Sequence, residues 1–153
     1  MQPLRRVVVL SLCWSAFLLA PGTSRGETAA ALAALEKVEY FSFGGVGIVG
    51  AMSPGDKLFR ELAAAPNKAE LFRTLWDKGN SQAKCYAVVG LYWLKDPSAD
   101  QFAQQLVSSH ASVSTAHGCM VGTREQPATF IDTIKSGQYL RYYFSDLVTR
   151  GGG

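Results

Sequence analysis

Histidine and cysteine are scarce in this sequence of 153 residues, which contains two of the first and three of the second. A zinc site needs three or four such ligands, and His110, His117, Cys85 and Cys119 follow no recognised metal-binding spacing. His117 and Cys119 could meet on one face of a strand, but two residues do not make a catalytic site. We therefore expect no metal ion and assign no catalytic residue.

A long apolar run is also lacking. Arg5 and Arg6 precede an apolar stretch at residues 7–20, and a polar segment of small residues follows it, which is the layout of a cleaved secretory signal. As a helix the apolar stretch would reach roughly 21 Å, short of a hydrocarbon core of about 30 Å. We predict a Sec-type signal peptide at residues 1–26, cleaved after Gly22 or Gly26, and a secreted or periplasmic protein.

Net charge is absent once this leader is removed. The remaining chain has 12 basic and 12 acidic residues, so the sequence pI of about 8.8 belongs mainly to the leader. No basic stripe remains that would attract nucleic acid or anionic lipid. We expect no nucleic-acid partner and no stable membrane anchor after cleavage.

Two cysteines, Cys85 and Cys119, remain after Cys13 leaves with the leader. An even number in an oxidising compartment predicts a structural disulfide. The bridge would close a loop of about 35 residues and contribute roughly 4 kcal/mol in the chain-entropy model. Two buried free thiols are the alternative.

The stretch Ser81–Lys95 is the most apolar part of the remaining chain, and Lys84 is the one charged residue in its interior. It predicts a helix that is buried on nearly all sides. Ala83, Ala87 and Gly90 recur at helical spacing and form a stripe of small residues, which would let a neighbouring helix approach closely.

Three segments around this helix carry matching apolar patterns. Residues 58–62 (LFREL) and residues 71–75 (LFRTL) each place Arg after a Leu-Phe pair, and residues 130–134 repeat the apolar part. Capping residues and prolines predict helices at 53–64, 67–78 and 96–109, with a shorter one at 128–136. We expect helices that press one face onto the central helix.

Short loops between the helices of residues 53–109 predict two antiparallel helical hairpins. In this they are similar to the units of HEAT-type α-solenoids. The resemblance covers about 57 of the 127 residues after the leader and lies in the helix pattern alone. It implies an architecture and carries no function.

The pattern of residue types in the sequence changes after residue 110. Alternation of larger and smaller residues over 111–121 predicts a half-buried strand. Residues 139–144 are rich in aromatics and would pair with it, although a final helix over 139–148 is an alternative. The predicted fold is mainly α, with helical hairpins around a central buried helix and a small β element after residue 110. It forms a single domain over residues 27–150, followed by a disordered glycine tail at 151–153.

Residues 45–50 match the pattern GxGxxG, which in dinucleotide-binding proteins opens a helix whose N-terminus meets the pyrophosphate. Here the helix start, Ser53-Pro54, comes after the pattern has ended. We therefore expect no cofactor, and predict an apolar loop or short strand packed on the core. A loop that contacts a partner is the alternative.

Tyr139, Arg141 and Tyr143 would share one face of a strand, and aromatic and Arg residues are enriched at protein interfaces. They are the candidate partner surface, for a protein partner that the sequence does not identify. The sequence favours a non-enzymatic binding or structural module. The alternatives are a small secreted hydrolase with an unrecognised site and an inhibitor or immunity-type protein that masks its partner.

Overall fold

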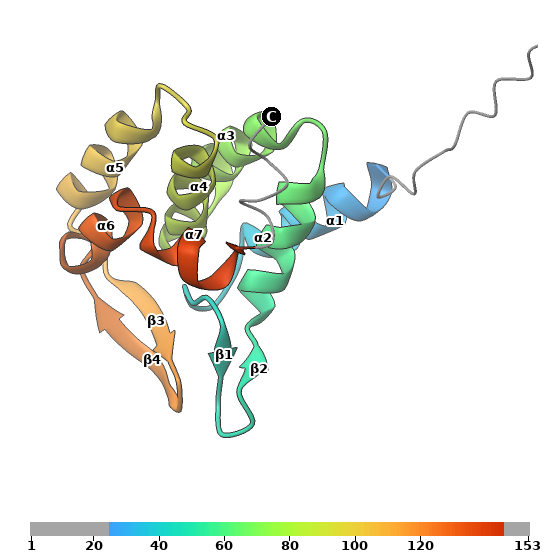
Figure 1. The fold of residues 1–153 in the computed structure, drawn as a ribbon. Helices are drawn as coiled ribbons and strands as arrows, with labels where there is room; N and C mark the ends of the chain where they lie inside the picture. Colours follow the sequence, from blue (N-terminus) through green and yellow to red (C-terminus); the bar gives the residue numbers. More distant parts are fainter. Residues whose placement is uncertain (1–24, 146–153) are drawn as a thin grey trace, which may run out of the picture.

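The structure is a computed structural model that describes residues 25–145. In these residues the chain forms helices around one hydrophobic core, and two short β-hairpins that project from the helical body on the same side (Figure 1). The helices are α1 (Arg25–Leu35), α2 (Pro54–Ala64), α3 (Lys68–Lys78), α4 (Ser81–Trp93), α5 (Ala99–Ser108), α6 (Pro127–Lys135) and α7 (Gln138–Tyr143). The strands are β1 (Gly45–Val46), β2 (Ala51–Met52), β3 (Val113–His117) and β4 (Met120–Glu125). The predicted mainly α class with a minor β part is confirmed.

The predicted leader and glycine tail fall largely outside the described residues. Arg25 and Gly26 are the exception, because they open α1. Cleavage after Gly26 would therefore remove the first two residues of this helix, whereas cleavage after Gly22 would leave it intact.

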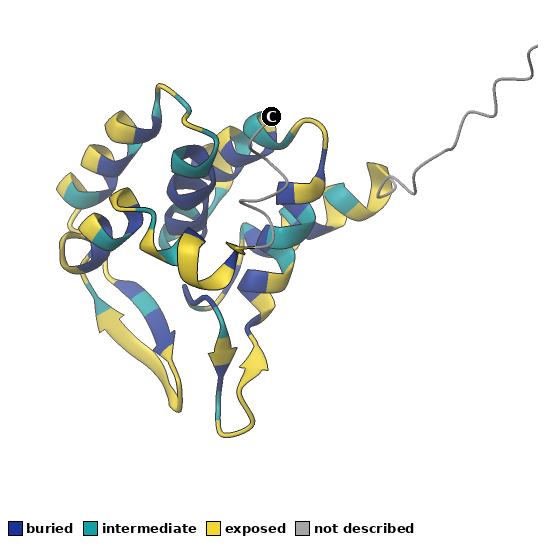
Figure 2. Ribbon diagram, in the orientation of Figure 1, coloured by how far each residue is buried: buried dark blue, intermediate teal, exposed yellow. Residues whose placement is uncertain are grey.

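Helix α4 is the central buried element, as predicted. All residues from Cys85 to Leu91 are buried, so helices cover it on every side (Figure 2). Its N-terminus is capped by Asn80, whose side-chain oxygen accepts a hydrogen bond from Ala83 N at 2.9 Å. The amide of the same side chain donates to Val38 O at 2.8 Å and ties the segment after α1 to the start of α4.

Close approach to the small-residue stripe is confirmed at Gly90. A Cβ atom there would lie 2.6 Å from the ring of Phe72 on α3, nearer than real Cβ atoms come. Phe72 in turn packs on Phe59 of α2, with ring centroids 5.1 Å apart, and both rings are fully buried. The repeated Leu-Phe-Arg segments therefore place their phenylalanines side by side in the core.

The arginines of these two segments take equivalent roles. Arg60 lies 2.9 Å from a carboxylate oxygen of Asp56 one turn earlier on α2. Arg73 on α3 pairs with Asp96, just after α4. Each arginine thus neutralises an aspartate that is itself largely shielded from water.

The pairing predicted for the C-terminal part is wrong. Strand β3 pairs antiparallel with β4, not with residues 139–144, which form helix α7. Gly118 and Cys119 make a two-residue connection in which Gly118 has φ of +55°. Glycine at the first position of such a connection favours a tight hairpin. Residues 139–143 lie in α7, so the alternative of a final helix holds for this part of the segment, and the buried Leu140, within it, and Phe144, just after its end, close the core.

Candidate functional site

The β1–β2 hairpin ends in a turn with apolar side chains at its tip. Gly50 N donates to Gly47 O at 3.1 Å and closes the turn around Ile48 and Val49. Turn positions usually hold Gly, Asn, Asp, Ser or Pro, yet these two side chains are 95 % and 87 % exposed. Met52, the last residue of β2, is 53 % exposed.

The β3–β4 hairpin carries a second exposed apolar pair, Met120 at 65 % and Val121 at 56 %. One face of this hairpin is anchored, because Val113, Thr115 and Ala116 of β3 are buried. Strand β4, by contrast, is exposed over most of its length. The two apolar residues at the start of β4, Met120 and Val121, are therefore both exposed to solvent.

The two hairpins lie side by side, joined through β1 and β3 (Figure 1). Val46 forms a parallel bridge with Gly118, and Gly47 N donates to Gly118 O at 2.8 Å. Nearer the core, Phe41 N donates to Ser114 O at 2.7 Å. Of the seven exposed large apolar or aromatic side chains in residues 25–145, five belong to these hairpins. We call these five the hairpin patch: Ile48, Val49, Met52, Met120 and Val121.

The hairpin patch is almost free of polar side chains. Residues 44–52 contain no side chain that is charged or that forms hydrogen bonds, and residues 118–122 contain one thiol, Cys119. The lack of polar side chains is visible in the sequence, because residues 40–55 include no charged residue. The predicted packing of this stretch against the core is wrong for its middle part, because Ile48 and Val49 are exposed to solvent.

A buried polar network holds the base of the β1–β2 hairpin. The hydroxyl of Tyr86 on α4 accepts a hydrogen bond from Ser42 N at 2.9 Å and donates to Ser42 O at 2.6 Å. Ser53 Oγ also donates to Ser42 O, at 2.8 Å, and accepts from Asp56 N at 3.1 Å. Burial raises the pKa of Tyr86 well above its usual value, so the phenol stays protonated. The network leads from the central helix directly to the hairpin.

Asp56 extends this network to the C-terminal helix. Its second carboxylate oxygen accepts from Gly44 N at 2.9 Å, while its first pairs with Arg60. The guanidinium of Arg60 also donates to Tyr143 O and lies 4.5 Å from the centre of the Phe144 ring. Gly44, with φ of +81°, faces the ring of Tyr143 so closely that a Cβ would meet it at 2.4 Å. The hairpin base is thus fixed by α2, α4 and α7 together.

The predicted partner surface at Tyr139, Arg141 and Tyr143 does not form one face. These residues lie on α7, where residues two apart point to different sides. Tyr139 and Tyr143 share a side, with stacked rings 6.4 Å apart, and Arg141 is exposed elsewhere on the helix. Burial, with a smaller effect of the nearby Glu125, raises the pKa of Tyr139 to about 12. Tyr139 is half-buried and packs against the core, whereas Tyr143 and Arg141 are exposed.

The predicted disulfide is absent from the structure, in which Cys85 and Cys119 are both free. Cys85 is fully buried in α4, and its thiol donates to Ser81 O at 3.3 Å. Cys119 is exposed at the end of the β3–β4 hairpin. The prediction rested on the number of cysteines alone. In the structure Cys85 points into the core and Cys119 lies on a projecting hairpin. Burial raises the pKa of the Cys85 thiol far above its usual value, so Cys85 is unreactive.

The residues considered for metal or cofactor chemistry are dispersed. Within residues 25–145 no three histidine, cysteine or carboxylate side chains gather as ligands. His117 lies 3.4 Å from a carboxylate oxygen of Glu125. The GxGxxG pattern forms β1 and the hairpin turn, and α2 begins only at Pro54, so the pattern does not place a helix N-terminus at a phosphate.

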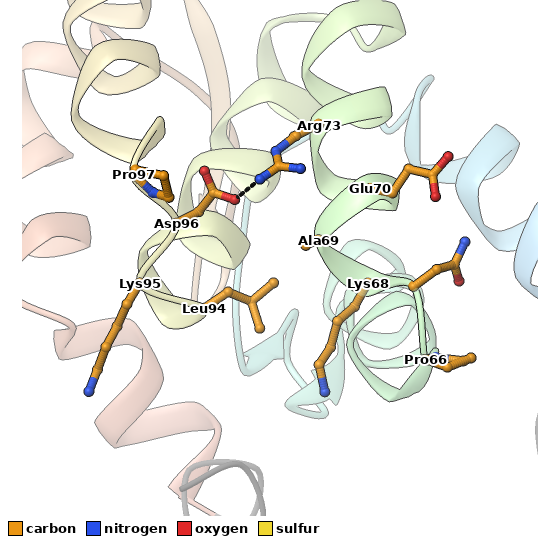
Figure 3. A pocket seen from close by; sticks show the side chains of 10 residues that line it. Pro66, Lys68, Ala69, Glu70, Arg73, Leu94, Lys95, Asp96 and Pro97 are labelled. Carbon is orange, nitrogen blue, oxygen red and sulfur yellow. Dashed lines mark hydrogen bonds and ion pairs between the residues drawn. The ribbon is translucent and has the colours of Figure 1, made fainter. Parts of the chain in front are cut away.

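A hollow of about 520 Å³ lies between the start of α3 and the end of α4 (Figure 3). Arg73 and Asp96 pair within it. Burial opposes ionisation of Asp96, but hydrogen bonds from Ser98 and Arg73 outweigh it and lower the pKa of the carboxyl. Lys68, at the rim, lies with its ammonium 5.2 Å from the centre of the Trp93 ring. These contacts link α3 to the α4–α5 loop and account for the charged side chains there.

None of the helices in residues 25–145 combines the length and the apolar character that a membrane crossing requires. Comparison with known protein families, characterised proteins and solved structures found no match to this chain.

Proposed function

We propose that this chain is a non-enzymatic binding module that engages its partner through the hairpin patch. The observation that carries the proposal is the concentration of exposed apolar side chains on two adjacent hairpins. Exposed apolar patches on monomeric proteins commonly mark interaction sites. The polar network at Ser42, Tyr86 and Asp56 supports the same function, because it joins the base of the β1–β2 hairpin to the helical body.

Photo-crosslinking tests this proposal. A benzoylphenylalanine residue replaces Val49 in the patch or, as the matched control, Tyr142, which is 75 % exposed on α7. Cells that produce each form are irradiated, and adducts with either protein or phospholipid are identified by mass spectrometry. We expect a discrete adduct from position 49 and none from position 142. Equal adduct formation from both positions, or none from position 49, would contradict the proposal.

We further propose that the protein acts outside the cytoplasm, as the Arg5-Arg6 pair and the apolar stretch after it indicate. N-terminal sequencing of the protein recovered from the cell envelope or medium tests this. We expect the sequence to begin at Thr23 or Glu27. A chain that begins at Met1 would contradict cleavage.

A further inference from the structure

We propose that the hairpin patch docks reversibly on the interface of a phospholipid bilayer. This inference rests on the proposed function, since it names the partner of the same surface. It differs from a membrane anchor, because docking would use only side chains at the ends of two hairpins and would leave the helical body in water.

The chemistry of the patch favours a bilayer over a protein. A specific protein interface carries about one hydrogen bond per 100–200 Å² of buried area, and polar side chains supply many of these bonds. Residues 44–52 offer no such side chain, and residues 118–122 offer only the thiol of Cys119. An apolar surface without polar groups can gain from burial in lipid, where no directional partner is needed.

The shape of the patch points the same way. Both hairpins project from the helical body toward one side, with exposed residues at their ends (Figure 2). Ile48 and Val49 are so exposed that few neighbouring atoms touch them. A folded partner would need a groove that matches both hairpin ends, whereas a bilayer adapts to their shape.

Two backbone amides at the tip of the β1–β2 hairpin already have hydrogen-bond partners within the protein, which favours burial away from water. Gly50 N bonds to Gly47 O, and Gly47 N bonds across to Gly118 O. Peptide groups without partners are costly in hydrocarbon, so these bonds reduce the cost of entry. Insertion would remain shallow, at a depth of about 5–10 Å near the boundary between headgroups and acyl chains.

Charges appear only behind the patch. The exposed charged residues next along the chain from Met52 and Val121 are basic, Lys57 and Arg124. Of the nearby acids, Asp56 is buried against Arg60, Glu125 is half-buried and accepts a hydrogen bond from Thr115 at 2.6 Å, and Glu39, before the β1–β2 hairpin, is exposed. Near the tip, His117 faces Glu125. With the tips inserted, Lys57 and Arg124 would lie toward the headgroups, which predicts a preference for anionic lipid.

Vesicle binding tests the inference. The exported protein is sedimented with vesicles of phosphatidylcholine alone, or of phosphatidylcholine with one quarter phosphatidylglycerol. We compare the wild type, the double variant Ile48→Asp/Val49→Asp, and the control Tyr142→Asp. All share one N-terminus, so the chain before residue 25 contributes equally to each. Circular dichroism confirms that the variants fold, as expected for side chains in contact with water.

We expect the wild type to bind, and anionic lipid to tighten binding by about fivefold for each basic side chain near the surface. The double variant should bind at least about tenfold more weakly, because two apolar side chains are replaced by charges. The control should bind like the wild type. A polarity-sensitive dye on Cys119 should shift to shorter wavelengths when vesicles are added.

Two results would overturn the inference. One is a wild-type protein that binds neither kind of vesicle, and the other is a double variant that binds as well as the wild type. The proposed function fails separately, through the crosslinking experiment. A protein adduct at position 49 without vesicle binding would keep the binding module and replace its lipid partner by a protein.

Discussion

Gly90 lies where α4 comes closest to α3, and the ring of Phe72 fills the space that a side chain would occupy. A Gly90→Leu variant should therefore be destabilised by on the order of 1–3 kcal/mol, since overpacking forces the core apart. Chemical denaturation measures this loss. Ala64→Leu, at an exposed position of α2, is the control and should change the free energy of unfolding little. Equal stability of the Gly90 variant and the wild type would contradict the packing of α4.

Cys85 and Cys119 should differ sharply in reactivity. Without reduction or denaturant, a maleimide should modify Cys119, which is exposed, and leave Cys85 unmodified, because its thiol is buried and protonated. In denaturant both should react, which mass spectrometry of the peptides shows. Protection of both cysteines until a reductant is added would instead indicate the disulfide that the structure lacks.

At single positions, the sequence predicted roles well where packing dictates them. The close approach at Gly90 and the burial of Phe59 and Phe72 followed from spacing, because helical periodicity fixes which residues share a face. The positions of Cys85 and Cys119 did not follow, since cysteine counting says nothing about which way a side chain points. Their separation depends on the hairpin that carries Cys119.

Among the elements, the two β-hairpins depend most on a few contacts with helices. Tyr86→Phe removes the hydroxyl that bonds to both Ser42 N and Ser42 O. We expect a loss of about 1–3 kcal/mol, because Ser42 N would be left buried without a partner. Hydrogen exchange should also accelerate over residues 42–52, ahead of α3 and α4. Tyr142→Phe is the matched control, and equal exchange rates in the two variants would contradict this role.

Helices α2 to α6 were predictable to within a few residues, whereas β4 was missed and α7 was predicted as a strand with a helix as the alternative. Capping residues and apolar spacing mark α2 and α3 directly in the sequence. Strand β4 contains Gly122 and exposed polar residues, so its alternation is weak. The aromatic run at 139–144 has high strand propensity, but the burial of Leu140 and Phe144 requires a helix.

At the scale of the whole molecule, stability should fall in alkaline solution. Burial raises the pKa values of Cys85 and Tyr86 in the folded chain above their ordinary values of about 8.5 and 10. Each group therefore holds its proton more tightly when folded, and its stabilisation is complete below its unfolded pKa. Above that pKa, stability should fall by on the order of 1.4 kcal/mol per pH unit for each group.

Urea midpoints between pH 8 and pH 11 measure this decline. We expect a first decrease above about pH 8.5 and a steeper one above about pH 10, because thiols and phenols titrate in that order. Tyr86→Phe should weaken the second component, to which Tyr139 also contributes because its pKa is raised by burial, and should keep the first. A midpoint that is constant up to pH 11 would show that neither group is buried in solution.

The overall class was predictable because the apolar residues of α4 and its neighbours leave few other ways to bury them. The hairpin patch could not be predicted, since its two halves are distant in the sequence and no local pattern relates them. Backbone contacts between residues far apart in the sequence, such as the bridge between Val46 and Gly118, bring the two halves together.

That bridge makes the patch a late product of chain assembly. Val46 and Gly118 are separated by helices α2, α3, α4 and α5, so the two hairpins can be adjacent only when this intervening chain is folded. A chain still emerging from the ribosome or from a translocation channel therefore shows one apolar hairpin and not the pair. The complete hairpin patch exists only in the folded protein, so a ligand that needs both hairpins would bind only the folded chain.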